Sequence, residues 1–179
     1  MSIEIVFETH ALTEDNERGI ATGWLPGRLS KRGRANAAEM GLRRRDDGIA
    51  AVFTSDLRRA VETVEIAFGD LDIPILHDWR LRECDFGARN GSPAAEIRGD
   101  RLDFCDRAYP DGESHSQAIE RVARLLADLP TRWTGRRVML IGHLATYRGL
   151  EHVINGFTVR ELLEADFQWR SEGWEYRLD

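Results

Sequence analysis

The sequence predicts an α/β protein, a three-layer α/β/α sandwich with a mostly parallel sheet and one antiparallel edge strand. Short apolar segments alternate along the chain with longer amphipathic segments, a pattern typical of parallel strands joined by helices. Residues 174–178 alternate apolar and polar side chains and form the predicted terminal strand. A chain of 179 residues is long enough for a sizeable core, and we expect residues 1–179 to form a single domain.

Two histidines directly follow predicted strands. The strand at 3–7 is short, β-branched and aromatic, and it ends near His10. The strand at 138–141 is wholly apolar and runs into His143. Such sheets bind ligands at the carboxyl ends of their strands, so both histidines are predicted at the binding edge. The remaining predicted strands are 49–54 and 74–76.

Capping residues mark several predicted helices. Ser114 with Gln117, and Thr158 with Glu161, have the spacing of a capping box. Residues 80–99 are rich in glycine, proline and charge, which predicts a functional loop with a short helix. The other predicted helices are 30–45, a helix after a cap at Ser55–Asp56, and 145–154.

The composition narrows the classes of partner. A formal net charge of -6 disfavours nucleic acid or an anionic membrane, so a phosphate site must be locally basic. Cys84 and Cys105 form neither a disulfide framework nor a CxxC pattern, and we expect reduced thiols. The N-terminus lacks a signal-peptide pattern, and no apolar run approaches the roughly 20 residues that span a bilayer. We therefore expect a cytoplasmic protein.

Phosphoryl transfer is the chemistry that these residues favour. A neutral histidine can attack phosphorus, although a strand-end histidine more often bonds only a nearby backbone group. Arg58 and Arg59 start a helix near the same edge, and at most one of these neighbours points inward to stabilise the charge on phosphate oxygens. Glu83 is a candidate acid for the leaving group, with a surface role equally compatible with the sequence.

Five segments match, in order, the motifs of one family. They are Thr9–His10–Ala11–Leu12–Thr13–Glu14–Asp15–Asn16 against R-H-G-x-T-x-x-N, Ser55–Asp56–Leu57–Arg58–Arg59–Ala60 with Thr63 against S-D-L-x-R-A-x-x-T, residues 81–87 against L-x-E-x-x-x-G, Gly112–Glu113–Ser114, and Ile141–Gly142–His143. Together they resemble the histidine phosphatase superfamily, in its phosphoglycerate-mutase-like branch. The match spreads over nearly the whole chain.

The resemblance implies a role for each matched residue. His10 would become phosphorylated, His143 would be its partner, and Glu83 would donate the proton. Arg59 and Asn16 would bind the phosphate. Thr22 and Gly23 align with a substrate-contacting loop, although a turn before the next helix explains them equally well. The implied activity is a histidine-dependent phosphatase, a phosphomonoesterase that acts through a phosphohistidine on a small phosphorylated metabolite, with no cofactor or metal.

Two departures from the motifs affect this expectation. Thr9 replaces the arginine before the nucleophile, which removes one charge-assisted bond worth about 1.5 to 3 kcal/mol. Ala11 and Leu144 stand where glycine usually follows each histidine. The arginines that could substitute for the missing one are Arg80, Arg82 and Arg148.

Several alternatives stay open at this level. A mutase is the nearest, although the segment from Cys84 to Ser114 is short for one. A non-catalytic phospholigand-binding protein is the second, because Thr9 lacks the charge of arginine. A helper role would use exposed tryptophans, which are more often core; the candidates are Trp133, Trp169 and Trp174. The oligomeric state, a homodimer included, is also open.

Overall fold

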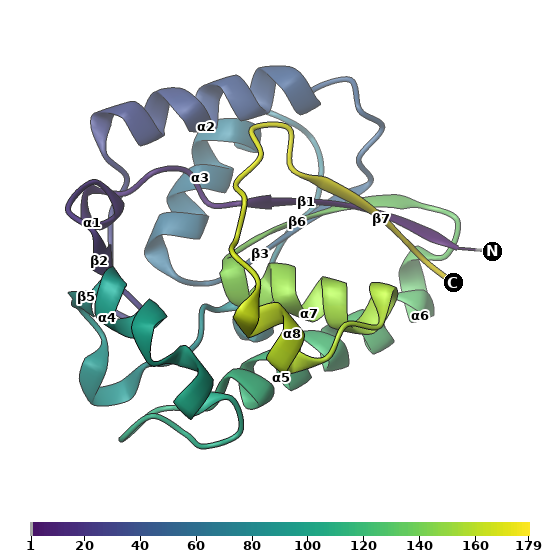
Figure 1. Ribbon diagram of the computed structural model, residues 1–179. Helices are drawn as coiled ribbons and strands as arrows, with labels where there is room; N and C mark the ends of the chain where they lie inside the picture. The colour runs from purple at the N-terminus through teal and green to yellow at the C-terminus, as the bar shows by residue number, and fades with distance from the viewer. Residues whose placement is uncertain (1) are drawn as a thin grey trace.

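A computed structural model describes residues 2–179. Its main sheet has the strand order β4-β3-β6-β1-β7, with β7 antiparallel to β1 and the other neighbours parallel (Figure 1). The predicted fold class is confirmed. The strands are β1 (Ile3–Thr9), β3 (Ala51–Thr54), β4 (Ile75–His77), β6 (Arg137–Gly142) and β7 (Trp174–Leu178), and a small second sheet pairs β2 (Ile20–Ala21) with β5 (Ser92–Pro93).

Alternate residues of the strands face two separate cores. Ile5 and Phe7 of β1 join a core with α5 and α7, whereas Val6 joins one with α2 and α3. Helices therefore cover both faces of the sheet, as Figure 1 shows. The helices are α1 (Glu14–Glu17), α2 (Lys31–Arg44), α3 (Arg58–Phe68), α4 (Ala94–Gly99), α5 (His115–Asp128), α6 (Pro130–Trp133), α7 (Leu144–Asn155) and α8 (Val159–Glu164).

Most predicted helix starts agree with the structure. Ser114 and Thr158 cap α5 and α8 through complete capping boxes. The predicted cap at Ser55–Asp56 is wrong, because α3 begins only at Arg58 and no side chain caps it. Ser55 Oγ instead accepts a bond from the Leu57 amide, and Asp56 pairs with a distant arginine.

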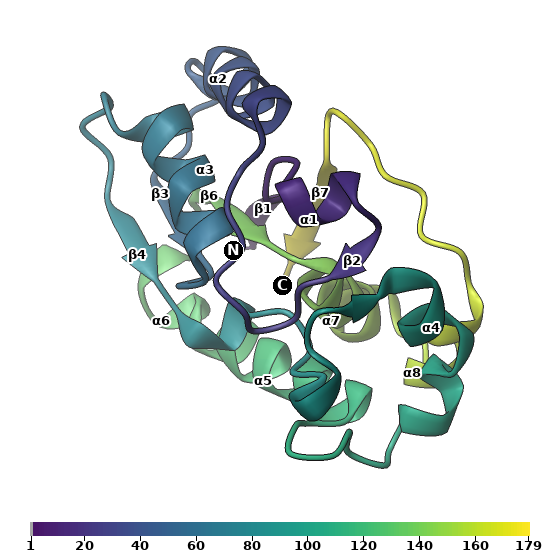
Figure 2. The same cartoon turned by 90° about the vertical axis from the view of Figure 1, so that its left-hand side faces the viewer.

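The carboxyl ends of the strands are overlaid by α1, β2, β5 and α4, on the side that faces the viewer in Figure 2. The segment predicted as a functional loop, 80–99, contains the short helix α4 and lies there. A short 3-10 helix at Gly87–Arg89 lies within the segment, and two others lie at its ends, at Trp79–Leu81 and Arg101–Phe104. The fold therefore places a layer of short elements above the two histidines.

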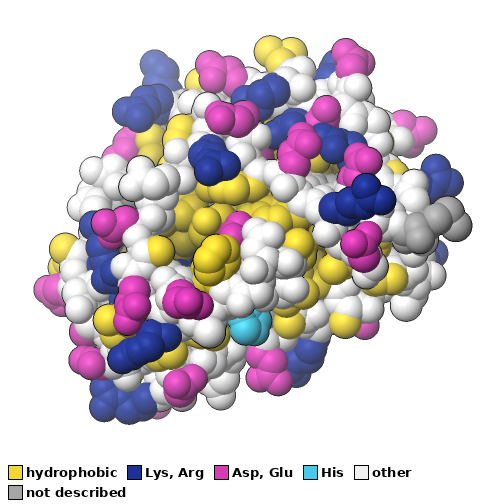
Figure 3. All heavy atoms as spheres, turned by 45° about the vertical axis from the view of Figure 1, so that its right-hand side comes forward, with side chains coloured by type: hydrophobic (Ala, Val, Ile, Leu, Met, Phe, Trp, Pro, Cys, Tyr) yellow, Lys and Arg dark blue, Asp and Glu magenta, His cyan; other side chains and the backbone are white. Residues whose placement is uncertain are grey.

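The surface is mixed in character. On the face shown in Figure 3, hydrophobic side chains gather in a hollow, and charged side chains of both signs surround it. Trp174 is buried in the core and Trp133 packs against it, whereas Trp169 is 64% exposed. Cys84 and Cys105 are free thiols. Within residues 2–179, every helix is too short or too polar to cross a membrane.

Candidate active site

His10 lies one residue beyond the end of β1. Its Nδ1 lies 2.7 Å from the carbonyl oxygen of Ala11 and donates to it, which leaves the lone pair on Nε2. Burial and the neighbouring Arg59 lower the pKa of His10 to about 3, against the opposing effect of the Ala11 bond. The ring is therefore neutral at neutral pH, with Nε2 in the form that a nucleophile needs.

His143 occupies the corresponding place beyond β6, and the two imidazole rings lie together. Their centroids are 5.0 Å apart, with the planes tilted by 54°. Burial, followed by Arg59 and His10, lowers the pKa of His143 well below its usual value. The free protein therefore favours the neutral ring of His143, and a bound phosphate anion would favour the charged form.

Arg59 points inward from the first turn of α3, whereas its neighbour Arg58 is exposed. Its Nε donates to Nε2 of His10 over 3.3 Å, and its Nη2 lies 3.3 Å from Nδ1 of His143. Nη2 also donates to the carbonyl of Gly23 over 2.8 Å. Burial lowers the pKa of Arg59 to about 10, which still leaves a full positive charge at neutral pH. The guanidinium of Arg59 thus contacts both imidazole rings.

Glu83 reaches the same place from the segment between β4 and α4. Its Oε1 accepts bonds from the backbone amides of Cys84, over 2.9 Å, and Ala145, over 3.2 Å. The second bond ties the carboxylate to the first turn of α7, directly after His143. The carboxyl group is thus held beside the histidines in the position that a proton donor would require.

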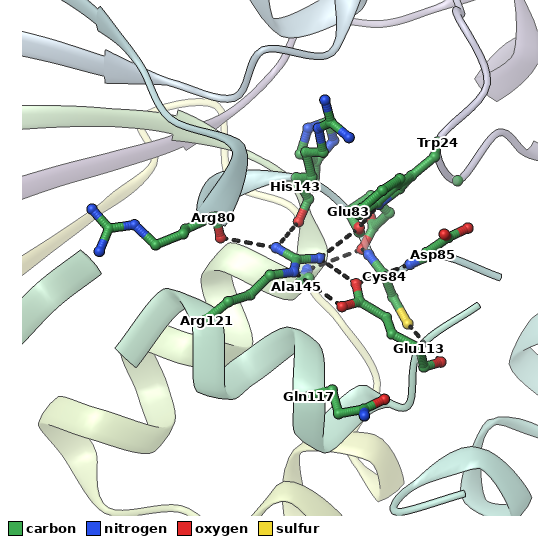
Figure 4. Close-up of polar contacts among 12 residues, drawn as sticks. Trp24, Arg80, Glu83, Cys84, Asp85, Glu113, Gln117, Arg121, His143 and Ala145 are labelled. Atoms are coloured by element: carbon green, nitrogen blue, oxygen red, sulfur yellow. Dashed lines mark hydrogen bonds and ion pairs between the residues drawn. The ribbon is translucent and has the colours of Figure 1, made fainter. Parts of the chain in front are cut away.

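A buried arginine that the sequence did not indicate holds the Glu83 backbone. Arg121 of α5 is 2% exposed and pairs with Glu113, and its guanidinium reaches the segment before Glu83 (Figure 4). Trp24 Nε1 donates to the same Glu83 carbonyl over 2.6 Å. The carbonyls that accept from Arg121 are those of Arg80 at 2.8 Å, Arg82 at 2.7 Å and Glu83 at 2.8 Å.

Two cavities meet at His10. One, the Arg59 cavity, has a volume of about 540 Å³ and is lined by Arg59, Thr22 and Gly23. The other, the Thr9 cavity, has a volume of about 530 Å³ and is lined by Thr9 and Trp169. Both cavities share five lining residues, which are His10, Asn16, Glu83, Leu144 and Phe167.

The three predicted substrate-contacting residues other than Arg59 also lie at this junction or beside it. Asn16 Oδ1 accepts from the Thr13 amide over 3.1 Å, which leaves its amide NH₂ group as a donor toward the cavities. Thr22 Oγ1 donates to Asp15 Oδ2 over 2.9 Å. Gly23 has a φ of 56° and presents its carbonyl to Arg59. All lie where a phosphate ester could contact them.

Of the three arginines that could replace the one missing at position 9, two are bound elsewhere. Arg82 forms a two-point ion pair with Asp56, and Arg80 pairs with Asp78 and Asp128. Arg148, from α7, lines the Arg59 cavity and is 7% exposed. Its Nε has no hydrogen-bond partner among residues 2–179.

The two residues in place of glycine are accommodated differently. Ala11 is buried, and its amide donates to Thr63 Oγ1 over 3.0 Å. Leu144 lines both cavities, so its side chain limits the space beside His143. Among residues 2–179, no group of three or more His, Cys, Asp or Glu side chains has a metal-binding arrangement.

Two histidines, an arginine and a glutamate thus gather at the carboxyl ends of the strands, an arrangement that could support phosphoryl transfer by positioning a nucleophile beside a positive charge. The model of the histidine phosphatase superfamily (branch 1) matches residues 5–169. The chain therefore belongs to this superfamily, in agreement with the predicted resemblance.

Sequence relatives and solved structures support the same assignment. The chain is 34% identical to the 2,3-bisphosphoglycerate-dependent phosphoglycerate mutase of Methylobacterium radiotolerans, over 86% of this chain and 80% of the relative. It is 29% identical to the enzyme of the same name from Neisseria meningitidis, over 99% of this chain and 95% of the relative. The structure of Bacillus stearothermophilus YhfR superposes with a TM-score of 0.81 at 25% identity, and the match covers 95% of this chain and 87% of that one. A mycobacterial glucosyl-3-phosphoglycerate phosphatase, at 24% identity and a TM-score of 0.79 over 92% and 84%, shares the fold.

Proposed function

We propose that this chain is a phosphoester hydrolase that acts on a small phosphorylated metabolite through a phosphohistidine at His10. One observation carries the proposal: Nε2 of His10 is neutral, lies at the junction of two cavities, and is contacted by Arg59. The pKa of about 3 keeps the attacking nitrogen unprotonated at neutral pH. Membership of a superfamily of phosphatases and mutases agrees with phosphoryl transfer.

The proposed reaction has two steps. In the first, Nε2 of His10 attacks phosphorus in line, the bond to the ester oxygen breaks, and Glu83 protonates the leaving oxygen. Arg59, Asn16 and His143 stabilise the equatorial oxygens, where charge develops. In the second step, water breaks the nitrogen–phosphorus bond, Glu83 takes up a proton, and phosphate leaves.

A generic aryl phosphate tests this proposal across acidic to neutral pH. Wild type should release the aryl alcohol, and His10→Ala should not. The matched control is His77→Ala, because His77 is exposed on β4 and lies outside both cavities. Equal rates for wild type and His10→Ala would instead support a non-catalytic phospholigand-binding protein, the reading that Thr9 favours.

A mutase is the second candidate, since several curated relatives carry that name. Mutases must protect the phosphohistidine from water, and the segment from Cys84 to Ser114, which includes β5 and α4, is short for a mutase. We therefore expect net phosphate release from phosphoglycerate without a bisphosphate activator. Interconversion of isomers with no phosphate release would establish the mutase instead.

A further inference from the structure

The wall of the Thr9 cavity includes the residue that directly precedes the proposed nucleophile. In the family motif an arginine precedes the nucleophilic histidine, whereas Thr9 has a short, uncharged side chain. Its Oγ1 accepts a bond from Nε1 of Trp169 over 3.2 Å. The Thr9 cavity extends from this pair to both histidines and Glu83. When the phosphorus of a substrate lies at His10, a substituent on that phosphorus can therefore extend into either cavity.

The charges that line the Thr9 cavity suit an uncharged substituent better than a further phosphate oxygen. Arg59 is the cation that contacts both histidines, and burial together with Arg59 holds the pKa of His143 well below its usual value. Arg43, in the wall of the Thr9 cavity, is already paired with Glu8 at 2.7 Å. The other arginines of that wall, Arg32 and Arg170, are exposed. Within the described part of the chain, the Thr9 cavity thus offers no buried, unpaired arginine, whereas Arg59 and Arg148 line the other cavity, so an uncharged ester substituent fits the Thr9 side.

The wall of the Thr9 cavity also favours an organic substituent over a bare phosphate oxygen. Trp169 is 64% exposed, and its indole is fixed by the bond to Thr9. Phe167, which lines both cavities, contributes a second aromatic side chain. Phe167 packs on the core against Tyr147 and Trp174, so the exposed ring of Trp169 is the face on which a flat, apolar ring could stack.

We propose that this site hydrolyses phosphodiesters as well as monoesters, with the non-leaving substituent in the Thr9 cavity and the leaving alcohol in the Arg59 cavity. The inference rests on the proposed function, because it uses the same nucleophile and acid. Nε2 of His10 forms a bond to phosphorus, the bond to the leaving oxygen breaks, and Glu83 protonates that oxygen. Water then cleaves the nitrogen–phosphorus bond and releases a phosphomonoester, while Glu83 recovers a proton.

The test compares bis(4-nitrophenyl) phosphate with 4-nitrophenyl phosphate as substrates. Wild type should hydrolyse both, and alkali-quenched enzyme should carry on His10 an adduct that retains one aryl group. Thr9→Arg, which fills the cavity and adds a charge, should lower the diester-to-monoester ratio of kcat/KM by at least about tenfold. Trp169→Ala should lower the same ratio mainly through the KM for the diester.

The controls separate the two proposals. Trp79→Ala removes another exposed tryptophan, outside both cavities, and should leave the ratio unchanged. Hydrolysis of the monoester but not the diester would overturn the inference and leave the proposed function standing. A ratio that neither Thr9→Arg nor Trp169→Ala lowers would also overturn it. Hydrolysis of neither ester would refute the proposed function, and this inference with it.

Discussion

Arg59 donates from Nε to Nε2 of His10 over 3.3 Å, so the cation contacts the nitrogen that would attack phosphorus. A phosphate entering the site would meet the guanidinium and the nucleophile together. Burial lowers the pKa of His10 most, and Arg59 lowers it further because a charged ring beside the guanidinium would be repelled.

Replacing Arg59 by lysine should separate positioning from charge. Arg59→Lys keeps a cation but loses the fork that reaches both histidines and Gly23. We expect kcat/KM for an aryl phosphate to fall by about 10- to 150-fold, equivalent to about 1.5–3 kcal/mol. Arg58→Lys, at the exposed neighbouring position, is the control and should change kcat/KM less than about twofold. Similar losses in the two variants would contradict the role given to Arg59.

Arg121 should matter for stability as well as activity. Arg121→Ala leaves Glu113 unpaired and three carbonyls without their buried donor. Breaking such a pair typically costs about 3–5 kcal/mol in the free energy of unfolding, which urea denaturation measures. Arg124→Ala removes an exposed ion pair from the same helix and should cost less than about 1 kcal/mol. Equal effects would show that the buried network is not a support of the Glu83 segment.

We expect replacement of Arg148 to change stability and activity in opposite directions. Its buried guanidinium, with Nε unpartnered, is costly in the free protein, and burial lowers its pKa. Arg148→Met should therefore leave Tm unchanged or raise it, while raising KM for esters whose leaving group reaches the Arg59 cavity. Thermal unfolding and steady-state kinetics on the same preparation check this. A lower Tm with an unchanged KM would indicate a structural role instead.

Three histidines with lowered pKa values, of which His115 and His143 are buried, should make the fold sensitive to mild acid. Burial, the largest cause in each case, lowers the pKa of His10 and His115 to about 3 and that of His143 well below its usual value. From about pH 6.5 down to about pH 3 the unfolded chain therefore binds more protons than the folded chain. The free energy of unfolding should fall as the pH falls through this window, by up to about 1.4 kcal/mol per pH unit for each histidine.

Urea unfolding at pH 6.5 and pH 5.5 measures that slope. His115→Gln removes one of the three groups and should reduce the slope by about a third. His77→Ala, at an exposed position, should leave it unchanged. A free energy of unfolding that is constant between these pH values would contradict the account of the buried neutral rings.

The sequence was informative where contacts are local. Periodicity located the main-sheet strands, and spacing located the capping boxes at Ser114 and Thr158, because both signals depend on near neighbours. The cap at Asp56 failed because Arg82, 26 residues away, binds that carboxylate. His10 and His143 could be predicted as neighbours because each follows a strand, and parallel strands end at the same edge of the sheet.

Contacts between distant segments carried no sequence signal. Arg121 appeared only as a residue of an amphipathic helix, yet it supports the Glu83 backbone 38 residues away. The bond between Trp169 and Thr9 spans 160 residues, and the cavity beside it follows from that contact. Such features depend on packing in three dimensions, which periodicity and spacing do not encode.

The most direct measurement maps the covalent intermediate. Enzyme mixed with a labelled aryl phosphate, quenched in alkali and digested should carry an acid-labile phosphoryl group on the peptide that contains His10. The label should be absent from the His10→Ala variant and present in the His77→Ala control. Label on another residue, or turnover without any phosphoenzyme in wild type under single-turnover conditions, would contradict the central claim that His10 is the nucleophile.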